Sequence, residues 1–213
     1  MQTPIPFQAP SEFEVALKPM NFLAHAYLSF GDAELVAGNL ISDFVKGKTQ
    51  YAYPQRIQQG IRLHRAIDAF TDAHPATKKA TTFFKTPYRL YSGAIMDILY
   101  DHFLATDETI FNEESLYLFS QTVYTSVEKQ AAHLPPVFIR VFGYMKAENW
   151  LWNYRTTEGI HRSLAGLVRR AAYLTEGETA FRIFQEQYHE LQACYRAFMP
   201  DVKNWAKQQI EML

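Results

Sequence analysis

The sequence predicts a single all-α domain. Apolar residues recur at spacings of three and four along almost the whole chain, which is the pattern of amphipathic helices. Alternating stretches typical of half-buried strands are essentially absent. The chain has 213 residues, of which 48% are hydrophobic and 15% aromatic, enough for one sizeable core and short for two domains. We therefore expect a single-domain helical bundle.

The first 19 residues are expected to lie outside that bundle. They contain four prolines and no basic residue before Lys18, so they resemble neither a helix nor a secretory signal. The helical pattern begins at Met20. We therefore predict a loosely ordered extension over residues 1–19 and a helical domain over residues 20–213.

Four helical segments are predicted in the first half of the domain. Apolar positions recur over 34–45, and Pro54 opens a long helix over 54–73. The His74-Pro75 step ends that helix and begins another that runs to about Phe84. A further helix is expected over 88–105, after Pro87.

The second half shows the same pattern, with clearer boundaries. Residues 113–131 are amphipathic, and the Pro135-Pro136 pair precedes a helix over 137–145. Another helix is expected over 159–174, after the aromatic segment NWLWNYR. Thr175 and Glu178 have the spacing of a capping box at the start of the C-terminal helical tail. Pro200 is expected to bend or divide that tail.

Composition excludes several classes of protein. The formal net charge of −1 provides no general attraction for nucleic acid. Cys194 is the single cysteine, so no disulfide can form within the chain, and a thiolate zinc site is disfavoured. No apolar run reaches the roughly 18 residues that a membrane-spanning helix needs. These features favour a cytoplasmic protein with no membrane span.

Two predicted helices carry polar residues on faces that should be apolar. At about 100° per residue, His64 and Asp68 share a face with Ile57 and Ile61. In the segment SGAIMDILYDHFL, Asp97 and Asp101 lie four residues apart and His102 follows them. Buried carboxylates cost several kcal/mol each unless they are paired or bind a cation. A divalent metal (Mn²⁺, Fe²⁺, Mg²⁺ or Zn²⁺) would remove that cost.

Each member of this set also has a purely structural explanation. A buried His–Asp hydrogen bond or an Asp–Arg bridge would account for either pair alone, but their joint occurrence favours a site. His25 and Asp43 lie among apolar residues and are further candidates. Asp72 is expected to cap the helix after Pro75 instead. The remaining histidines are predicted to lie on the surface: His74, His133, His161 and His189.

Four motifs carry a resemblance to a known family. MNFLAHAYLSF, GNLISDFVKG, GIRLHRAIDAFTD and MDILYDHFLA, in this order and spacing, resemble the acyl carrier protein phosphodiesterase family, a divergent relative of the HD-domain metal-dependent phosphohydrolases. The resemblance implies an HD-like all-helical fold. It also implies Mn²⁺-dependent hydrolysis that removes 4′-phosphopantetheine from the serine of holo-acyl carrier protein. HD domains carry an adjacent His-Asp pair, whereas this chain has the reversed Asp101-His102.

With that resemblance, the expected site can be stated residue by residue. The metal shell is drawn from six candidates: His25, Asp43, His64, Asp68, Asp97 and Asp101. Mn²⁺ is the expected ion, with Mg²⁺ or Fe²⁺ as alternatives, and His64 or His102 would protonate the leaving serine oxygen. An acidic carrier protein would need a local basic surface, for which the candidates are Arg62, Arg65, Lys78, Lys79 and Arg89. Aromatic residues such as Trp150 are candidates for lining a pantetheine channel.

Two other functions stay open on the sequence alone. The same residues could hydrolyse a nucleotide or another small phosphoester. Alternatively, the chain could be a non-catalytic helical protein that binds carrier proteins or lipids, with its buried acids paired to arginines. Metal analysis separates the last function from the other two, because a binder of that kind would carry no divalent ion.

Overall fold

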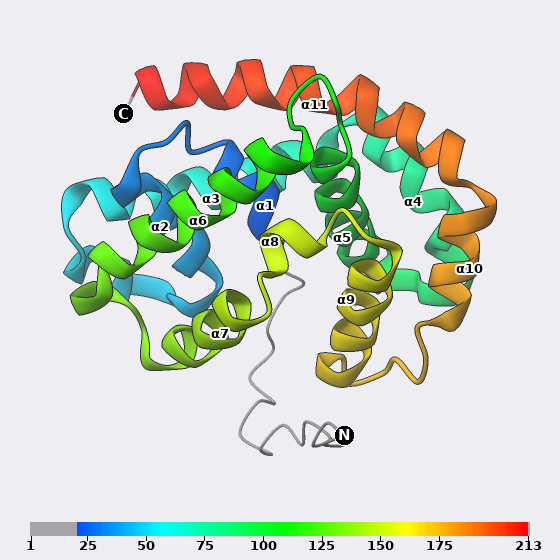
Figure 1. Cartoon of the computed structure of the whole chain (residues 1–213), viewed down its shortest axis with the longest axis horizontal. Coiled ribbons are helices and arrows are strands. Elements are labelled where there is room, and N and C mark those ends of the chain that lie inside the picture. Colours follow the sequence, from blue (N-terminus) through cyan, green and yellow to red (C-terminus); the bar gives the residue numbers. More distant parts are fainter. Residues whose placement is uncertain (1–20, 213) are drawn as a thin grey trace.

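Helices form nearly all of the regular structure in the computed structural model, which describes residues 21–212 of the chain (Figure 1). No strand occurs in this described part, so the prediction of an all-α protein is confirmed. The predicted extension over residues 1–19 lies outside the described residues. No helix within residues 21–212 is both long enough and apolar enough to cross a membrane.

Eleven α-helices follow one another along the described chain. They are α1 (Phe22–Tyr27), α2 (Ala33–Ile41), α3 (Gln55–Ala73), α4 (Pro75–Tyr88), α5 (Ser92–Ala105), α6 (Glu113–Lys129), α7 (Pro136–Ala147), α8 (Trp150–Asn153), α9 (Thr157–Arg170), α10 (Glu178–Glu186) and α11 (Tyr188–Glu211). Four short 3₁₀ turns connect some of them: η2 (Ser42–Phe44), η3 (Gly47–Ala52), η4 (Arg89–Tyr91) and η5 (Ala131–His133).

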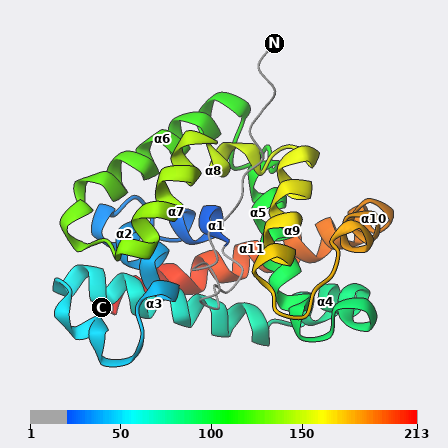
Figure 2. The ribbon, with the colours of Figure 1, turned by 90° about the horizontal axis from the view of Figure 1, so that it is seen from below.

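One continuous hydrophobic core holds these helices together. The helix α5 is central to it, because nearly all of its side chains are buried and it packs against α1, α4 and α9. The long helix α11 runs across one side of the molecule (Figure 1). Viewed from below, α1 lies in the interior, with α2 and α3 on one side and α5 on the other (Figure 2). This arrangement brings α1 against α5.

The helices α2 and α3 pack unusually closely because two glycines face each other. A Cβ atom added at Gly38 would lie 2.2 Å from the carbonyl oxygen of Ile57 and 2.9 Å from the Cα of Gly60. A Cβ atom added at Gly60 would lie 2.5 Å from the carbonyl oxygen of Leu35. Any larger side chain would therefore push the two backbones apart. This contact sets the position of α3, which carries His64 and Asp68.

The structure corrects four details of the sequence prediction. The ring of His74, rather than the carboxylate of Asp72, caps α4, with the amide of Ala76 donating to its Nδ1 at 3.2 Å. The helix expected from residue 88 begins at Ser92, because η4 intervenes. Gly177, rather than Thr175, is the N-cap of α10. The helix α11 continues through Pro200 rather than dividing there.

Two of the four histidines predicted for the surface are exposed, His133 and His189. His161 and His74 are half-buried: His161 pairs with the exposed Glu178, and the ring of His74 is edge-on to Phe198. The role of His74 as a cap explains why it is drawn into the packing.

Candidate metal centre

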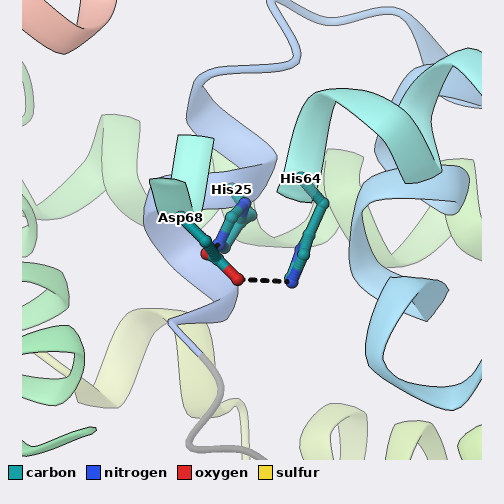
Figure 3. A group of neighbouring side chains, drawn as sticks. All are labelled: His25, His64 and Asp68. Carbon is teal, nitrogen blue, oxygen red and sulfur yellow. Dashed lines mark ion pairs between the residues drawn. The ribbon is translucent and has the colours of Figure 1, made fainter. Parts of the chain in front are cut away.

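Four of the six predicted ligands meet at one place. His25 on α1 and His64 on α3 each direct Nε2 toward Asp68, at 3.2 Å from Oδ1 and 3.4 Å from Oδ2 respectively (Figure 3). Asp43 on η2 adds a second carboxylate, with Oδ1 3.5 Å from Nε2 of His64. Asp68 thus offers one oxygen to each imidazole, and three separate elements contribute to the cluster.

The two imidazoles are stacked, and one nitrogen of each ring has no partner. Their ring centroids are 3.9 Å apart and their planes differ by 18°. Both residues are buried; each Nε2 contacts only carboxylate oxygens, and neither Nδ1 has a hydrogen-bond partner within residues 21–212. Buried polar atoms normally have a partner, so these nitrogens need an explanation. A cation held between the nitrogens and the carboxylate oxygens is the explanation that fits the donor set.

The pKa values of the two histidines are shifted in opposite directions. Burial lowers the pKa of His25, and the neighbouring charge of His64 lowers it further. Burial also opposes a charge on His64, but the carboxylates of Asp43 and Asp68 outweigh it and raise its pKa to about 9. Asp68 is partly buried, yet the two histidines hold its pKa below the usual range. Without a metal, the cluster therefore binds a proton at His64 near neutral pH.

A small cavity lies beside these side chains. It has a volume of about 10 Å³ and is lined by Asn21, Phe22, His25, Asn39, Leu40, Asp43 and His64. That is room for about one water molecule or one ion. The side-chain oxygen of Asn39 in its wall is buried and has no hydrogen-bond partner among the described residues. Asn39 was not among the predicted site residues, although it lies within the motif GNLISDFVKG, four residues before Asp43, and that place was a possible signal.

The predicted ligand Asp101 has a different position, at the start of α1. It is fully buried, and its two oxygens accept hydrogen bonds from the backbone amides of Leu23 at 3.0 Å and Ala24 at 2.8 Å. Burial raises its pKa to about 8 in spite of these hydrogen bonds. Asp101 therefore acts as a cap supplied by α5 to a helix whose own N-cap residue, Asn21, makes no side-chain cap bond.

The other end of α1 is also held by side chains. Asn39 on α2 donates to the backbone oxygen of His25 at 3.0 Å, and Ser29 donates to the same oxygen at 2.8 Å. Asn39 also donates to the hydroxyl of Ser29 at 3.1 Å. With Asp101 at its start and this network at its end, α1 holds the imidazole of His25 in a fixed place.

Asp97 lies in the electrostatic field of the cluster without contacting the histidines. Burial raises its pKa well above the usual value, and the charges of Asp68, Asp72, Asp101 and Asp43 raise it further. A carboxyl group that responds to these acids lies near them on α5. Asp97 therefore interacts electrostatically with acids of the cluster, and its membership of the metal shell stays a prediction.

His102 lies apart from the cluster. Its Nδ1 is 2.8 Å from the backbone oxygen of Tyr154, and its Nε2 is 3.3 Å from the hydroxyl of Tyr188. Both ring nitrogens are therefore engaged with groups outside the site. These contacts join α5 to α8 and α11, which is a structural role. The other candidate proton donor, His64, is within the cluster.

The predicted basic residues are all exposed, on α3, α4 and η4. Two of them have partners: Arg65 donates to the backbone oxygen of Val45 at 2.9 Å, and Lys79 pairs with Glu190 at 3.0 Å. For the other three no ion pair with a described acid occurs: Arg62, Lys78 and Arg89. Their role in docking a partner stays a prediction.

Comparison with known proteins identifies relatives over most of the chain. A family model described as "Acyl carrier protein phosphodiesterase" matches residues 20–202. A protein of that name from Yersinia pestis is 35% identical over 191 residues, which is 88% of this chain and 98% of that protein. Another from Pectobacterium atrosepticum is 32% identical, over 89% of this chain and 99% of that protein. One from Enterobacter sp. is also 32% identical, over 88% and 98%. No solved structure matches.

Proposed function

This chain belongs to the acyl carrier protein phosphodiesterase family, and on that premise we propose that it is a metal-dependent hydrolase of holo-acyl carrier protein. Water adds to phosphorus, and the bond between phosphorus and the serine oxygen breaks. The serine oxygen takes up a proton. The products are apo-acyl carrier protein and 4′-phosphopantetheine, which keeps the phosphate.

The proposed metal shell consists of the residues that meet at the cluster: His25, Asp43, His64 and Asp68, with Asp97 beside them. Mn²⁺ is the proposed ion, and Mg²⁺ and Fe²⁺ are the alternatives. When bound, such an ion lowers the pKa of a coordinated water and withdraws charge from phosphoryl oxygens. Within the protein, Asp101 and Asn39 orient His25 through its helix, while Asp68 aligns the two imidazoles through its two oxygens.

One observation carries this proposal. Two buried, stacked imidazoles share the carboxylate of Asp68, at 3.2 and 3.4 Å, and neither Nδ1 has a hydrogen-bond partner within the described chain. A non-catalytic binder was expected to pair its buried acids with arginines. Here the charged partners of Asp43 and Asp68 are histidines, and the partners of Asp101 are backbone amides. The donor set therefore supports a cation better than it supports a purely structural cluster.

The substrate would be an acidic protein, so docking needs a basic surface. We propose that Arg62, Lys78 and Arg89 contribute to it, together with the already paired Arg65 and Lys79. We also propose a cytoplasmic site of action, because a chain with one buried, unpaired cysteine suits a reducing compartment.

The direct test is to incubate holo-acyl carrier protein with the purified protein and Mn²⁺, and then to measure intact mass. Loss of the phosphopantetheine mass is expected in the presence of the ion and not after chelation. His64→Ala and Asp68→Asn should each abolish that loss. His189→Gln is the matched control, because His189 is exposed on α11 and should leave the rate unchanged.

Two outcomes would contradict the proposal. Full activity of the double variant His64→Ala/Asp68→Asn would show that this cluster is not the active site. Cleavage of a small phosphodiester such as bis(p-nitrophenyl) phosphate, with no mass loss from holo-acyl carrier protein under any ion, would instead favour a small-molecule phosphohydrolase.

A further inference from the structure

A second, much larger cavity opens next to the proposed metal centre. It has a volume of about 630 Å³, within the range of roughly 300–1,000 Å³ that is usual for small-molecule sites. Its walls come mainly from α7, α8 and α9, and Figures 1 and 2 both show α7 and α9 on opposite sides of α8. The function described above has not used this space.

Two residues connect the large cavity to the metal centre. Phe22 lines both the large cavity and the small cavity beside His25 and His64. Ile98 also lines the large cavity and directly follows Asp97 on α5. Because Phe22 lies one turn before His25 on α1, a ligand in the large cavity would have one end next to the cluster.

Two arginines on α9 converge in this cavity without a counter-ion. A Cβ atom added at Gly166 would lie 3.1 Å from Nη1 of Arg170 and 3.6 Å from Nη2 of Arg169, so both guanidinium groups lie over the same point of the helix. Neither forms an ion pair with an acid in the described chain. By contrast, Arg162 on the same wall is paired with Glu158 at 2.7 Å.

Of the two arginines, Arg170 has the less favourable environment for its charge. It is half-buried, and its Nε is fully buried without a hydrogen-bond partner among residues 21–212. Burial lowers its pKa; Tyr154 opposes this lowering, and the adjacent charge of Arg169 adds to it. An exposed guanidinium beside a half-buried one, with no acid paired to either, is unfavourable unless an anion binds them. The pair therefore indicates an anionic ligand.

The rest of the lining suits a ligand that is apolar as well as anionic. Phe22, Val141 and Trp150 supply apolar surface, whereas Asn153, Thr156 and Ser163 supply hydrogen-bonding groups. The product of the proposed reaction has matching parts. It carries a phosphate, a dimethyl-substituted carbon with a hydroxyl beside it, two amides and a terminal thiol.

We propose that the cavity between α7, α8 and α9 binds the 4′-phosphopantetheine arm, with Arg169 and Arg170 providing the counter-charge for its phosphate once hydrolysis has freed it from the serine and from the metal centre. This inference rests on the proposed function and assigns the substrate arm to a place in the fold. Since hydrolysis leaves the phosphate on the arm, the released product keeps every group that the cavity recognises. Binding of the arm can therefore be measured without turnover and without metal.

The experiment is calorimetric titration of the metal-free full chain with 4′-phosphopantetheine, with pantetheine and with inorganic phosphate. We expect 4′-phosphopantetheine to bind about tenfold or more tightly than pantetheine, because charge-assisted hydrogen bonds to arginine are strong. In Arg169→Gln/Arg170→Gln this difference should disappear while pantetheine binding persists. Ala165→Trp, which fills the cavity from α9, should weaken both organic ligands. Arg182→Gln on α10, whose arginine is exposed and paired with Glu186, should change neither.

A second variant moves the two cations without removing them. In Gly166→Ala the new methyl group presses against the guanidinium of Arg170, so the preference for 4′-phosphopantetheine should fall while pantetheine binding stays the same. Thermal unfolding of each variant verifies that it is folded.

Three results would overturn the inference. Equal binding of 4′-phosphopantetheine and pantetheine to the natural chain would exclude the role of the arginines. Absence of binding by either, or inorganic phosphate binding as tightly as 4′-phosphopantetheine, would exclude an arm-binding cavity. A protein that cleaves holo-acyl carrier protein but fails this titration refutes this inference alone, whereas one that binds the arm but does not cleave refutes the proposed reaction alone.

Discussion

Asp68 connects the two histidines of the cluster, because its carboxylate contacts both. Its two oxygens lie within 3.4 Å of the imidazoles of His25 and His64, which reach it from different helices. Because those imidazoles have no other hydrogen-bond partner in the described chain, their protonation depends on the neighbouring acids and on whatever cation they hold. The protonation of these two histidines therefore links metal binding to pH.

Metal affinity should rise with pH. Asp43 and Asp68 raise the pKa of His64 to about 9 in the absence of metal, so a metal ion must displace a proton from His64 at any pH below that value. Exchange of one proton predicts that the Kd for Mn²⁺ falls about tenfold for each pH unit between pH 6 and 8, and levels off near pH 9. Calorimetry at several pH values measures this slope. A Kd that is independent of pH would show that His64 is not a ligand.

His102 and His64 should respond differently to the same substitution. His102→Gln removes a ring that connects α5 to Tyr154 and Tyr188, so it should lower thermal stability but leave most of the activity per folded molecule. His64→Gln should abolish activity even in folded protein, and near neutral pH it should also lower stability, because the carboxylates that raise the pKa of His64 to about 9 lose their partner. Activity and thermal unfolding, measured together on both variants, test the assignment. Loss of activity in a stably folded His102→Gln would return His102 to the catalytic set.

At the scale of the elements, α1 depends on α5. It is a six-residue helix, too short to be stable alone, and Asp101 supplies the acceptors for its first amides. Asp101→Ala would leave two buried amides without partners, at a cost of about 1–3 kcal/mol each. Asp101→Asn keeps one acceptor and should cost about half as much. Denaturant unfolding of the two variants gives the order; equal stabilities would contradict it.

The glycine contact between α2 and α3 sets the distance between Asp43 and His64. In Gly60→Ala the new methyl group would meet a backbone oxygen at 2.5 Å, which only movement of a helix can relieve. We expect a loss of about 2 kcal/mol or more in stability, together with weaker metal binding. Gly143→Ala on α7 is the matched control, because a Cβ atom there meets nothing within 4 Å. Unchanged metal affinity in Gly60→Ala would show that the site tolerates displacement of α3.

For the whole molecule, the net charge predicts no general attraction of an acidic partner, whereas a local basic surface would attract one. The chain is nearly neutral, so attraction of an acidic carrier protein has to come from local basic residues. If Arg62, Lys78 and Arg89 form that surface, the KM for holo-acyl carrier protein should rise with ionic strength while kcat stays constant. Steady-state kinetics across a salt series tests this. A KM that is insensitive to salt would indicate apolar docking.

The sequence predicts relations within a helix better than relations between helices. Spacing of four residues places His64 and Asp68 on one face, and the structure has them there. Asp101 and His102 are neighbours on α5, and their spacing does not predict which other element each side chain contacts. One turns to the start of α1 and the other to Tyr154.

The parts of the candidate site that depend on contacts between helices could not be predicted from the sequence. Asn39 and the facing glycines act through contacts that no periodicity describes. Arg169 and Arg170 have the sequence of an ordinary helix end, and their significance comes from the cavity that α7 and α8 enclose with them. Helix boundaries were predicted best where proline marks them, as at Pro75 and Pro136.

The dependence of α1 on Asp101 also has a consequence during synthesis on the ribosome. The cap and the amides it holds are 77 and 78 residues apart, so His25 has no stable position until α5 has left the exit tunnel and packed. A nascent chain that ends before α5 would therefore lack an assembled centre, even though His25, Asp43, His64 and Asp68 have already been made. The fold thus delays its own chemistry until more than half of the polypeptide has been translated, because α5 ends at residue 105 of 213 and must first leave the tunnel.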